Sequence, residues 1–102
     1  MDKKTYTINF YPSAYNDLEN IKMYWEKNLE KESDDFMAEL YQKTKSLEES
    51  PFLHHLPNNE YLRSKGYRIL SVRNYNVFYT VTDTEVQIHR VLYNKMDFTK
   101  LF

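Results

Sequence analysis

The stretch YRILSVRNYNVFYTVTDTEVQIHRVLY, residues 67–93, decides the fold of this chain. Apolar and polar side chains alternate through three runs within it: Tyr67–Val72, Asn76–Val81 and Glu85–Leu92. Period-two alternation is typical of β-strands that bury one face. Polar residues at 73–74 and 82–84 mark turns between the runs. The stretch therefore predicts three consecutive antiparallel strands.

Strand register assigns these residues to the two faces of the sheet, because side chains alternate strictly along a strand. A two-residue turn at 83–84 places His89 opposite Phe78. For the other turn we prefer a three-residue loop at 73–75, since a two-residue loop would turn Arg68 towards the buried face. The helix-facing side is then expected to carry Tyr67, Ile69, Val77, Tyr79, Val81, Val86 and Ile88.

The opposite face of the sheet has no predicted helix to cover it. Its expected residues are Arg68, Leu70, Val72, Asn76, Phe78, Thr80, Gln87, His89 and Val91. An apolar centre with a basic rim is typical of a surface where a protein partner docks. The expected partner contacts are Leu70, Val72, Asn76, Phe78 and Val91.

The N-terminal half predicts a strand followed by a helical hairpin. Alternation over Thr5–Phe10 indicates the strand, and Ser13 is a plausible helix N-cap. Apolar residues at steps of three and four predict the first helix: Ala14, Leu18, Ile21, Trp25 and Leu29. A second helix is expected from Ser33 to Pro51, after a turn near 30–32. Residues 51–66 show no period and are expected to form a loop.

The element order β-α-α-β-β-β predicts a single α+β domain over residues 1–102, with the helical hairpin packed on one face of an antiparallel sheet. The absence of Cys excludes disulfides and thiolate chemistry, and the single Gly excludes a Gly-rich phosphate loop. No apolar run could span a membrane, so we expect a cytoplasmic, soluble protein. The formal net charge of −1 hides an acidic half at 1–60 and a basic half at 61–102.

Segments 68–81, RILSVRNYNVFYTV, and 90–98, RVLYNKMDF, resemble the RelE/ParE superfamily of type II toxin–antitoxin toxins. YTINFYPSAYNDLENI at 6–21 is similar to the first strand and helix of that family, and ESPF at 49–52 to the end of its second helix. The resemblance covers nearly the whole chain. It implies a small toxin without a cofactor, neutralised by a cognate antitoxin protein encoded by an adjacent gene.

The resemblance also bears on the target of the toxin. RelE-type members cleave mRNA on the ribosome with basic side chains, whereas ParE-type members poison DNA gyrase and lack those residues. Leu70 stands where RelE-like toxins carry a second lysine, and Asn76 where they carry an arginine. The ParE-like reading, a gyrase-binding growth inhibitor, is therefore favoured. A ribosome-dependent mRNA endoribonuclease is the alternative, and a non-toxic relic that only binds a partner is a third hypothesis.

Four residues would be catalytic if the chain were an endoribonuclease: His89, Tyr93, Lys95 and Arg68. Attack by a 2′-hydroxyl needs a base, an acid and cations that stabilise the phosphorane. His89 is the natural titrating group near neutral pH, and Lys95 or Arg68 could hold phosphate. The structural alternative for His89 is an exposed or interface residue opposite Phe78.

Other polar residues have structural interpretations. Arg90 falls on the helix-facing side in this register, where an unpaired cation would be costly. We therefore expect an ion pair between Arg90 and a helix acid or the Phe102 carboxylate. Asp97 is read as a turn or salt-bridge residue. The adjacent His54 and His55 lack a nearby third ligand, so no metal site is expected.

Overall fold

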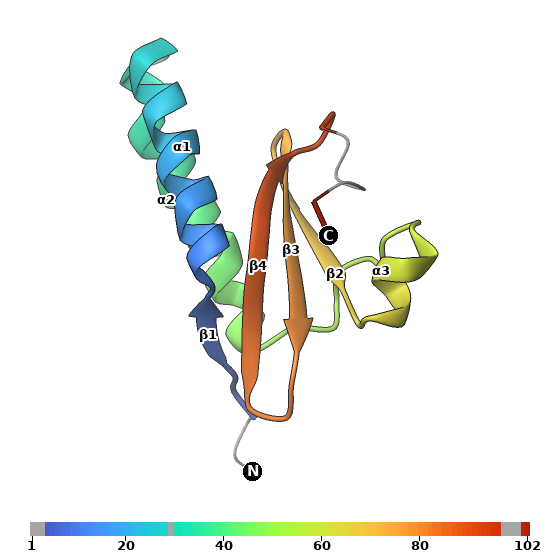
Figure 1. The fold of residues 1–102 in the computed structure, drawn as a ribbon. Coiled ribbons are helices and arrows are strands. Elements are labelled where there is room, and N and C mark those ends of the chain that lie inside the picture. The colour runs from blue at the N-terminus through green and yellow to red at the C-terminus, as the bar shows by residue number, and fades with distance from the viewer. Residues whose placement is uncertain (1–3, 29, 97–100) are drawn as a thin grey trace.

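A computed structural model describes residues 4–28, 30–96 and 101–102 of the chain (Figure 1). The helices are α1 (Pro12–Asn28), α2 (Glu30–Lys45), a short 3-10 helix η1 (Ser46–Glu48) and α3 (Glu60–Ser64). The strands are β1 (Thr7–Phe10), β2 (Arg68–Val72), β3 (Tyr75–Val81) and β4 (Glu85–Tyr93). Asp97, read from sequence as a turn or salt-bridge residue, lies outside the described residues.

The strands form one sheet in the order β1-β4-β3-β2. β1 pairs parallel with β4, and the other two strand pairs are antiparallel. Figure 1 shows α1 and α2 together on one side of this sheet, with α3 on the other. The α+β class and the helical hairpin are confirmed, while the expected purely antiparallel sheet is in fact mixed.

The second helix of the hairpin both begins and ends earlier than expected. α2 begins at Glu30 rather than at Ser33, whose buried hydroxyl has no hydrogen-bond partner in the described part of the chain. The helix ends at Lys45 and continues only as η1, so the prediction that it runs to Pro51 was wrong. Good helix-forming residues at 30–32 explain why the second helix starts early.

The expected loop at 51–66 contains a helix, which corrects that prediction. The side chain of Asn59 accepts a hydrogen bond from the backbone N–H of Leu62 at 3.0 Å, so Asn59 caps α3. Asn is among the preferred N-cap residues. Gly66, at φ 84°, ends the segment in the left-handed region that glycine adopts without strain.

The turn between β2 and β3 has two residues, so the preferred three-residue loop was wrong. Arg68 pairs with Tyr79, and Ile69 with Phe78. The sequence argument against this register was that it would bury Arg68. At the sheet edge Arg68 stays half-exposed and donates to the carbonyls of Phe52 and His54, at 3.4 and 3.3 Å.

This register reverses the expected faces of β2. Leu70 and Val72 belong to the main core beneath the helices, together with Val77, Tyr79 and Val91. Ile69 points to the other side, where a second core is formed by Leu62, Ile69, Phe78 and Leu92 with Tyr67 and Phe102 packed against it. The expected bare face of the sheet is therefore covered at Phe78, by Leu62 of α3 and by the C-terminal residue.

Candidate functional site

β4 contains a β-bulge at His89. Tyr79 pairs with Ile88, whereas the preceding residue Phe78 pairs with Arg90, so His89 is the extra residue on β4. The predicted pairing of Phe78 with His89 was therefore wrong. A bulge bends its strand and re-aims the neighbouring side chains. Here it brings both His89 and Arg90 to positions that regular alternation would not provide.

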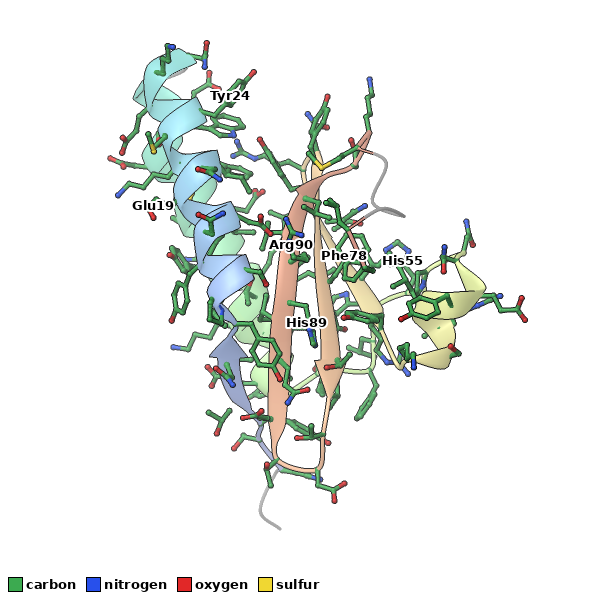
Figure 2. The ribbon with its side chains drawn as sticks, viewed as in Figure 1. Glu19, Tyr24, His55, Phe78, His89 and Arg90 are labelled. Carbon is green, nitrogen blue, oxygen red and sulfur yellow. The ribbon has the colours of Figure 1, made fainter. Side chains whose placement is uncertain are left out.

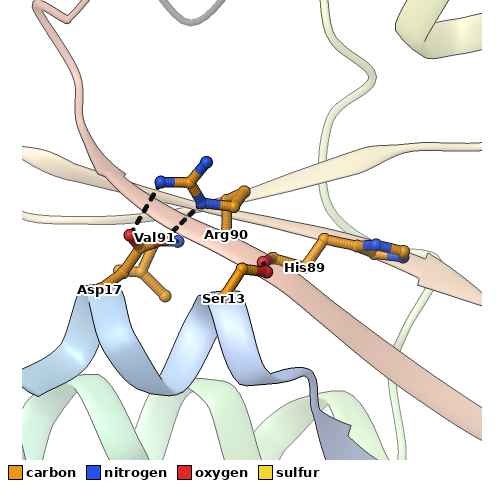
Figure 3. Close-up of polar contacts among 5 residues, drawn as sticks. All are labelled: Ser13, Asp17, His89, Arg90 and Val91. Carbon is orange, nitrogen blue, oxygen red and sulfur yellow. Dashed lines mark hydrogen bonds and ion pairs between the residues drawn. The ribbon is translucent and has the colours of Figure 1, made fainter. Parts of the chain in front are cut away.

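Beyond the end of β1, the backbone groups along the edge of β4 form hydrogen bonds with α1 and with Tyr11, the residue before it. The N–H of Tyr11 donates to the carbonyl of Ile88 at 2.9 Å, and the Ser13 hydroxyl donates to the carbonyl of His89 at 2.7 Å. Asp17 accepts from the N–H of Val91 at 2.9 Å (Figure 3). Side chains of a helix thus replace the strand hydrogen bonds that β1 does not reach.

Asp17 also holds Arg90 by a two-point ion pair, at 2.7 Å to Nε and 2.9 Å to Nη2 (Figure 3). The hydrogen bonds that Arg90 donates to Asp17 raise the pKa of Arg90 against the opposing effect of burial. The predicted ion pair between Arg90 and a helix acid is confirmed. This carboxylate is the partner that makes a half-buried guanidinium acceptable.

His89 lies between two tyrosine rings. Its ring centroid is 4.6 Å from that of Tyr11 and 4.9 Å from that of Tyr67, both edge-to-face. Nε2 of His89 lies 2.9 Å from the Thr80 hydroxyl. Burial lowers the pKa of His89 below its ordinary value, because the imidazolium would lose hydration there. His89 is therefore neutral at physiological pH.

A chain of hydrogen bonds determines which nitrogen of His89 carries the proton. The Glu85 carboxylate can only accept, so the amide nitrogen of Gln87 faces it at 2.9 Å. Gln87 Oε1 then accepts from the Thr80 hydroxyl at 2.9 Å. That hydroxyl has one proton, so it must accept from His89 Nε2. The neutral ring consequently presents Nδ1 as a hydrogen-bond acceptor.

In the described part of the chain no group donates a hydrogen bond to Nδ1 of His89. His89 lines a groove of about 460 Å³ between α3 and the strands β3 and β4. Figure 2 shows the ring on the side of the sheet away from α1 and α2.

The groove combines aromatic and polar side chains from β3, β4 and three other segments. Tyr61 and Lys65 come from α3 and its C-cap, Tyr67 from the position before β2, and Phe102 from the C-terminus. Burial, and secondarily the hydroxyls of Tyr61 and Tyr11, raise the pKa of Tyr67, so its hydroxyl stays protonated. The groove can therefore stack a flat group, donate hydrogen bonds and accept one at His89.

The other candidate catalytic residues do not lie near His89. Arg68 points to the helix side of the sheet, where its guanidinium lies 5.1 Å from the Phe52 ring. Tyr93 lies four residues beyond His89, about 13 Å along the strand. Its ring contacts Tyr75, with centroids 5.8 Å apart. Lys95 is exposed beyond the end of β4. A four-residue ribonuclease centre is not assembled.

The expected partner-binding residues are mostly inaccessible. Leu70, Val72 and Val91 are buried under the helical hairpin, and Phe78 is buried on the opposite side. Only Asn76 remains partly exposed, and it accepts a hydrogen bond from Ser71 at 3.1 Å. The prediction of a bare apolar sheet face was wrong for two reasons. The two-residue turn and the bulge on β4 turn Leu70, Val72 and Val91 to the helix side, and α3 and Phe102 cover Phe78.

The sequence did not predict four of the groove residues as site residues: Tyr61, Lys65, Tyr67 and Phe102. The available signal was the sequence NNEY at 58–61, in which Asn59 could have been recognised as an N-cap followed by Glu60 in the first turn. A five-residue helix is too short to show an apolar period, however. Its presence beside His89 depends on contacts distant in sequence.

No group of three potential metal ligands occurs among the described residues. His54 and His55 are adjacent, and burial, followed by the neighbouring charge of His55, lowers the pKa of His54. Within the same residues no helix is long and apolar enough to cross a membrane.

Solved structures of three toxin–antitoxin modules share this fold. A chain of the chromosomal ParDE TA system from P. aeruginosa aligns with a TM-score of 0.73 and 16% identity, covering 88% of this chain and 97% of that one. A chain of the YoeB-YefM complex from Staphylococcus aureus gives 0.56 and 22%, covering 86% and 95%. A chain of the E. coli DinJ-YafQ toxin-antitoxin complex gives 0.58 and 19%, covering 96% and 98%.

At these identities the three likenesses show a shared fold alone. A family model described as the ParE toxin of the type II toxin-antitoxin system parDE matches residues 8–98, and the chain belongs to this family. Among curated protein sequences, none matches the chain.

Proposed function

We propose that this chain inhibits bacterial growth by binding DNA gyrase, and that a cognate antitoxin protein neutralises it. Membership of the ParE toxin family supports the gyrase target. The shared fold with chains of the ParDE TA system and of the DinJ-YafQ toxin-antitoxin complex supports the antitoxin partner.

The observation that supports this proposal most directly is that the candidate residues for RNA cleavage lie far apart in the fold. His89 lies in the groove, Arg68 lies on the other face of the sheet, and Tyr93 is about 13 Å farther along β4. General acid–base catalysis requires groups within hydrogen-bond reach of the same reacting atoms. The arrangement therefore favours an inhibitory binder over an endoribonuclease.

The test combines controlled induction in bacteria with an assay on the purified chain. We expect growth arrest, a DNA damage response, intact transcripts and inhibition of supercoiling by purified gyrase. Co-expression of the neighbouring antitoxin should reverse the arrest. Growth arrest with cleaved mRNA that is lost in Tyr93→Phe would contradict the proposal and establish the ribonuclease. No arrest at all, with tight antitoxin binding, would identify a non-toxic relic.

A further inference from the structure

β1 leaves its outer side unpaired. It is the outermost strand of the sheet, and β4 pairs with its inner side only (Figure 1). The N–H groups of Thr7 and Tyr11 point inwards, to acceptors 3.0 and 2.9 Å away on the β4 side. Because successive residues of a strand alternate, the N–H and C=O groups of Ile8 and Phe10 point outwards. In the described part of the chain, neither of these two N–H groups has a hydrogen-bond partner.

An edge strand usually carries a feature that prevents another strand from pairing with it. Lysine, proline, a β-bulge and a covering helix or loop are such features. At the opposite edge of the sheet, the N–H of Ile69 on β2 donates to the carbonyl of His55, so a loop covers that edge. β1 is covered at its start, where the N–H of Tyr6 donates to the carbonyl of Glu48 at 2.8 Å. From residue 7 to residue 10 the described structure shows none of these features on β1.

The edge of β1 is uncharged, which suits a second copy of this chain. Residues 5–16 contain no Lys, Arg, Asp or Glu, although 28% of the chain is charged. Two identical strands that meet about a two-fold axis place like residues near one another, so a charged edge would repel its own copy. An uncharged edge also offers no ionic attraction to nucleic acid, an anionic membrane or a charged peptide. The charged residues around η1 and the start of β1 are of both signs: Lys4, Lys45, Glu48 and Glu49.

We propose that β1 pairs antiparallel with β1 of a second copy, about a two-fold axis at Asn9. Ile8 of each copy then lies opposite Phe10 of the other, and each such pair exchanges two backbone hydrogen bonds. Other registers leave an outward group unpaired. An axis at Ile8 would place Phe10 opposite Tyr6, whose N–H is already bonded. An axis at Phe10 would place Ile8 opposite Pro12, which has no N–H.

The side chains along β1 support the same pairing. On the helix side, Ile8 of one copy meets Phe10 of the other, and each apolar cross-strand pair contributes about 0.2–1 kcal/mol. The ring of Tyr15, 59% exposed and 5.5 Å from that of Phe10, extends the apolar surface beyond the strand. The pair joins two four-stranded sheets into one. A four-residue strand gives a small interface, so we expect a Kd of about 10–1,000 μM.

The test uses the full chain, purified free of antitoxin, at concentrations from about 10 μM to about 1 mM. Sedimentation velocity should show a monomer that converts to a dimer and to nothing larger. Amide hydrogen exchange at Ile8 and Phe10 should slow as the concentration rises, whereas Thr7, whose N–H is bonded inside the sheet, should not change. A sample that mixes two isotope labels should show NMR contacts between Ile8 of one copy and Phe10 of the other.

A matched pair of variants identifies the strand as the interface. Asn9→Lys places two lysines opposite one another across the axis and should weaken the dimer at least about ten-fold. Asn20→Lys makes the same change at an exposed position on α1 and should leave the dimer unchanged. Both side chains are exposed in the single chain, so neither variant should unfold it. Amide spectra of the dilute variants check that they are folded.

Several outcomes would overturn the proposal. A monomer at about 1 mM would do so, as would a dimer that Asn9→Lys and Asn20→Lys weaken equally. Assemblies larger than a dimer would also contradict it, because an interface about a two-fold axis closes on itself. If the amides of Ile8 and Phe10 were protected only in the presence of the antitoxin, the edge would belong to the antitoxin and not to a second copy. None of these measurements depends on growth arrest or on gyrase.

Discussion

At the scale of single residues, Asp17 joins α1 to β4 through three hydrogen bonds. Its two oxygens accept from Arg90 Nε, Arg90 Nη2 and the N–H of Val91, across more than seventy residues of sequence. The carboxylate is nearly buried, with 9% of its side chain exposed. Such a group is stabilising only while its partners remain, since each would otherwise be left desolvated.

Replacing Asp17 by Ala should destabilise the fold strongly. The change leaves the Arg90 guanidinium and the Val91 N–H without a partner, which costs about 3–5 kcal/mol for a buried pair. We expect a loss of about 3 kcal/mol in the free energy of unfolding, measured by urea denaturation. Glu19→Ala is the matched control, because Glu19 is an exposed acid on the same helix (Figure 2) and should change stability by less than about 0.5 kcal/mol.

His89 should make stability depend on pH. Burial lowers its pKa in the folded state, so the unfolded chain binds the proton more readily. Stability is therefore full above the unfolded pKa of about 6.5 and is lost as pH falls from there towards the folded pKa. Urea midpoints from pH 8 to pH 5 should fall in the native protein and fall less in His89→Gln. The pKa of His54 is also lowered in the folded chain, so His54 accounts for part of the pH dependence that remains in His89→Gln. Identical slopes would show that His89 contributes nothing.

At the scale of elements, the β2–β3 turn connects the sheet to both helices of the hairpin. Arg73 occupies the left-handed region at φ 53° and pairs with Glu39 at 3.1 Å. Its guanidinium also lies over the stacked rings of Trp25 and Phe36, at 5.9 and 5.5 Å. The two-residue turn is thus maintained by side-chain contacts that offset an unfavourable backbone conformation.

Two substitutions at Arg73 separate these opposing effects. Both Arg73→Ala and Arg73→Gly remove the ion pair and the ring contact, but only glycine relieves the backbone strain. We expect Arg73→Gly to be more stable than Arg73→Ala by about 1 kcal/mol. Trp25 fluorescence during urea unfolding provides the measurement, because Trp25 is the only tryptophan. Equal stability of the two variants would mean that the turn relaxes without strain.

At the scale of the whole molecule, the sheet separates two cores of different size. The larger lies under α1 and α2, and the smaller lies under α3 and the C-terminal residue. Phe102 contacts Phe78 at 5.2 Å and Tyr67 at 5.0 Å between ring centroids. The chain end thus helps to bury Phe78, which is 1% exposed.

Phe102→Ala should open this smaller core. A partly buried phenyl group contributes about 1–2 kcal/mol, less than the 3–5 kcal/mol of a fully buried one. For a chain of this length we expect Tm to fall by about 4–16 °C in calorimetry. Leu101→Ala, one residue earlier and 41% exposed, is the control and should leave Tm nearly unchanged. Faster amide exchange at Ile69 should accompany the loss only in the Phe102 variant.

Much of the architecture was predictable because local patterns determine it. Period-two alternation predicted the strands that became β2, β3 and β4, and the three–four spacing predicted α1. The need of a half-buried cation for a partner predicted the ion pair of Arg90 with a helix acid, although the sequence could not single out Asp17. The full-length resemblance also predicted the RelE/ParE superfamily, and the chain belongs to its ParE toxin family.

Which residues are exposed was decided only in three dimensions. A shift of one residue in a turn exchanges the faces of a strand, so the choice between two and three residues at 73–75 moved Leu70 and Val72 into the core. The bulge at His89 lies where α1 side chains bond to the edge of β4, a contact between segments distant in sequence. The sequence by itself determined the elements and their order, since periodicity is local. The groove depended on packing between Tyr61, His89 and Phe102, which are distant in sequence and meet only in the folded chain.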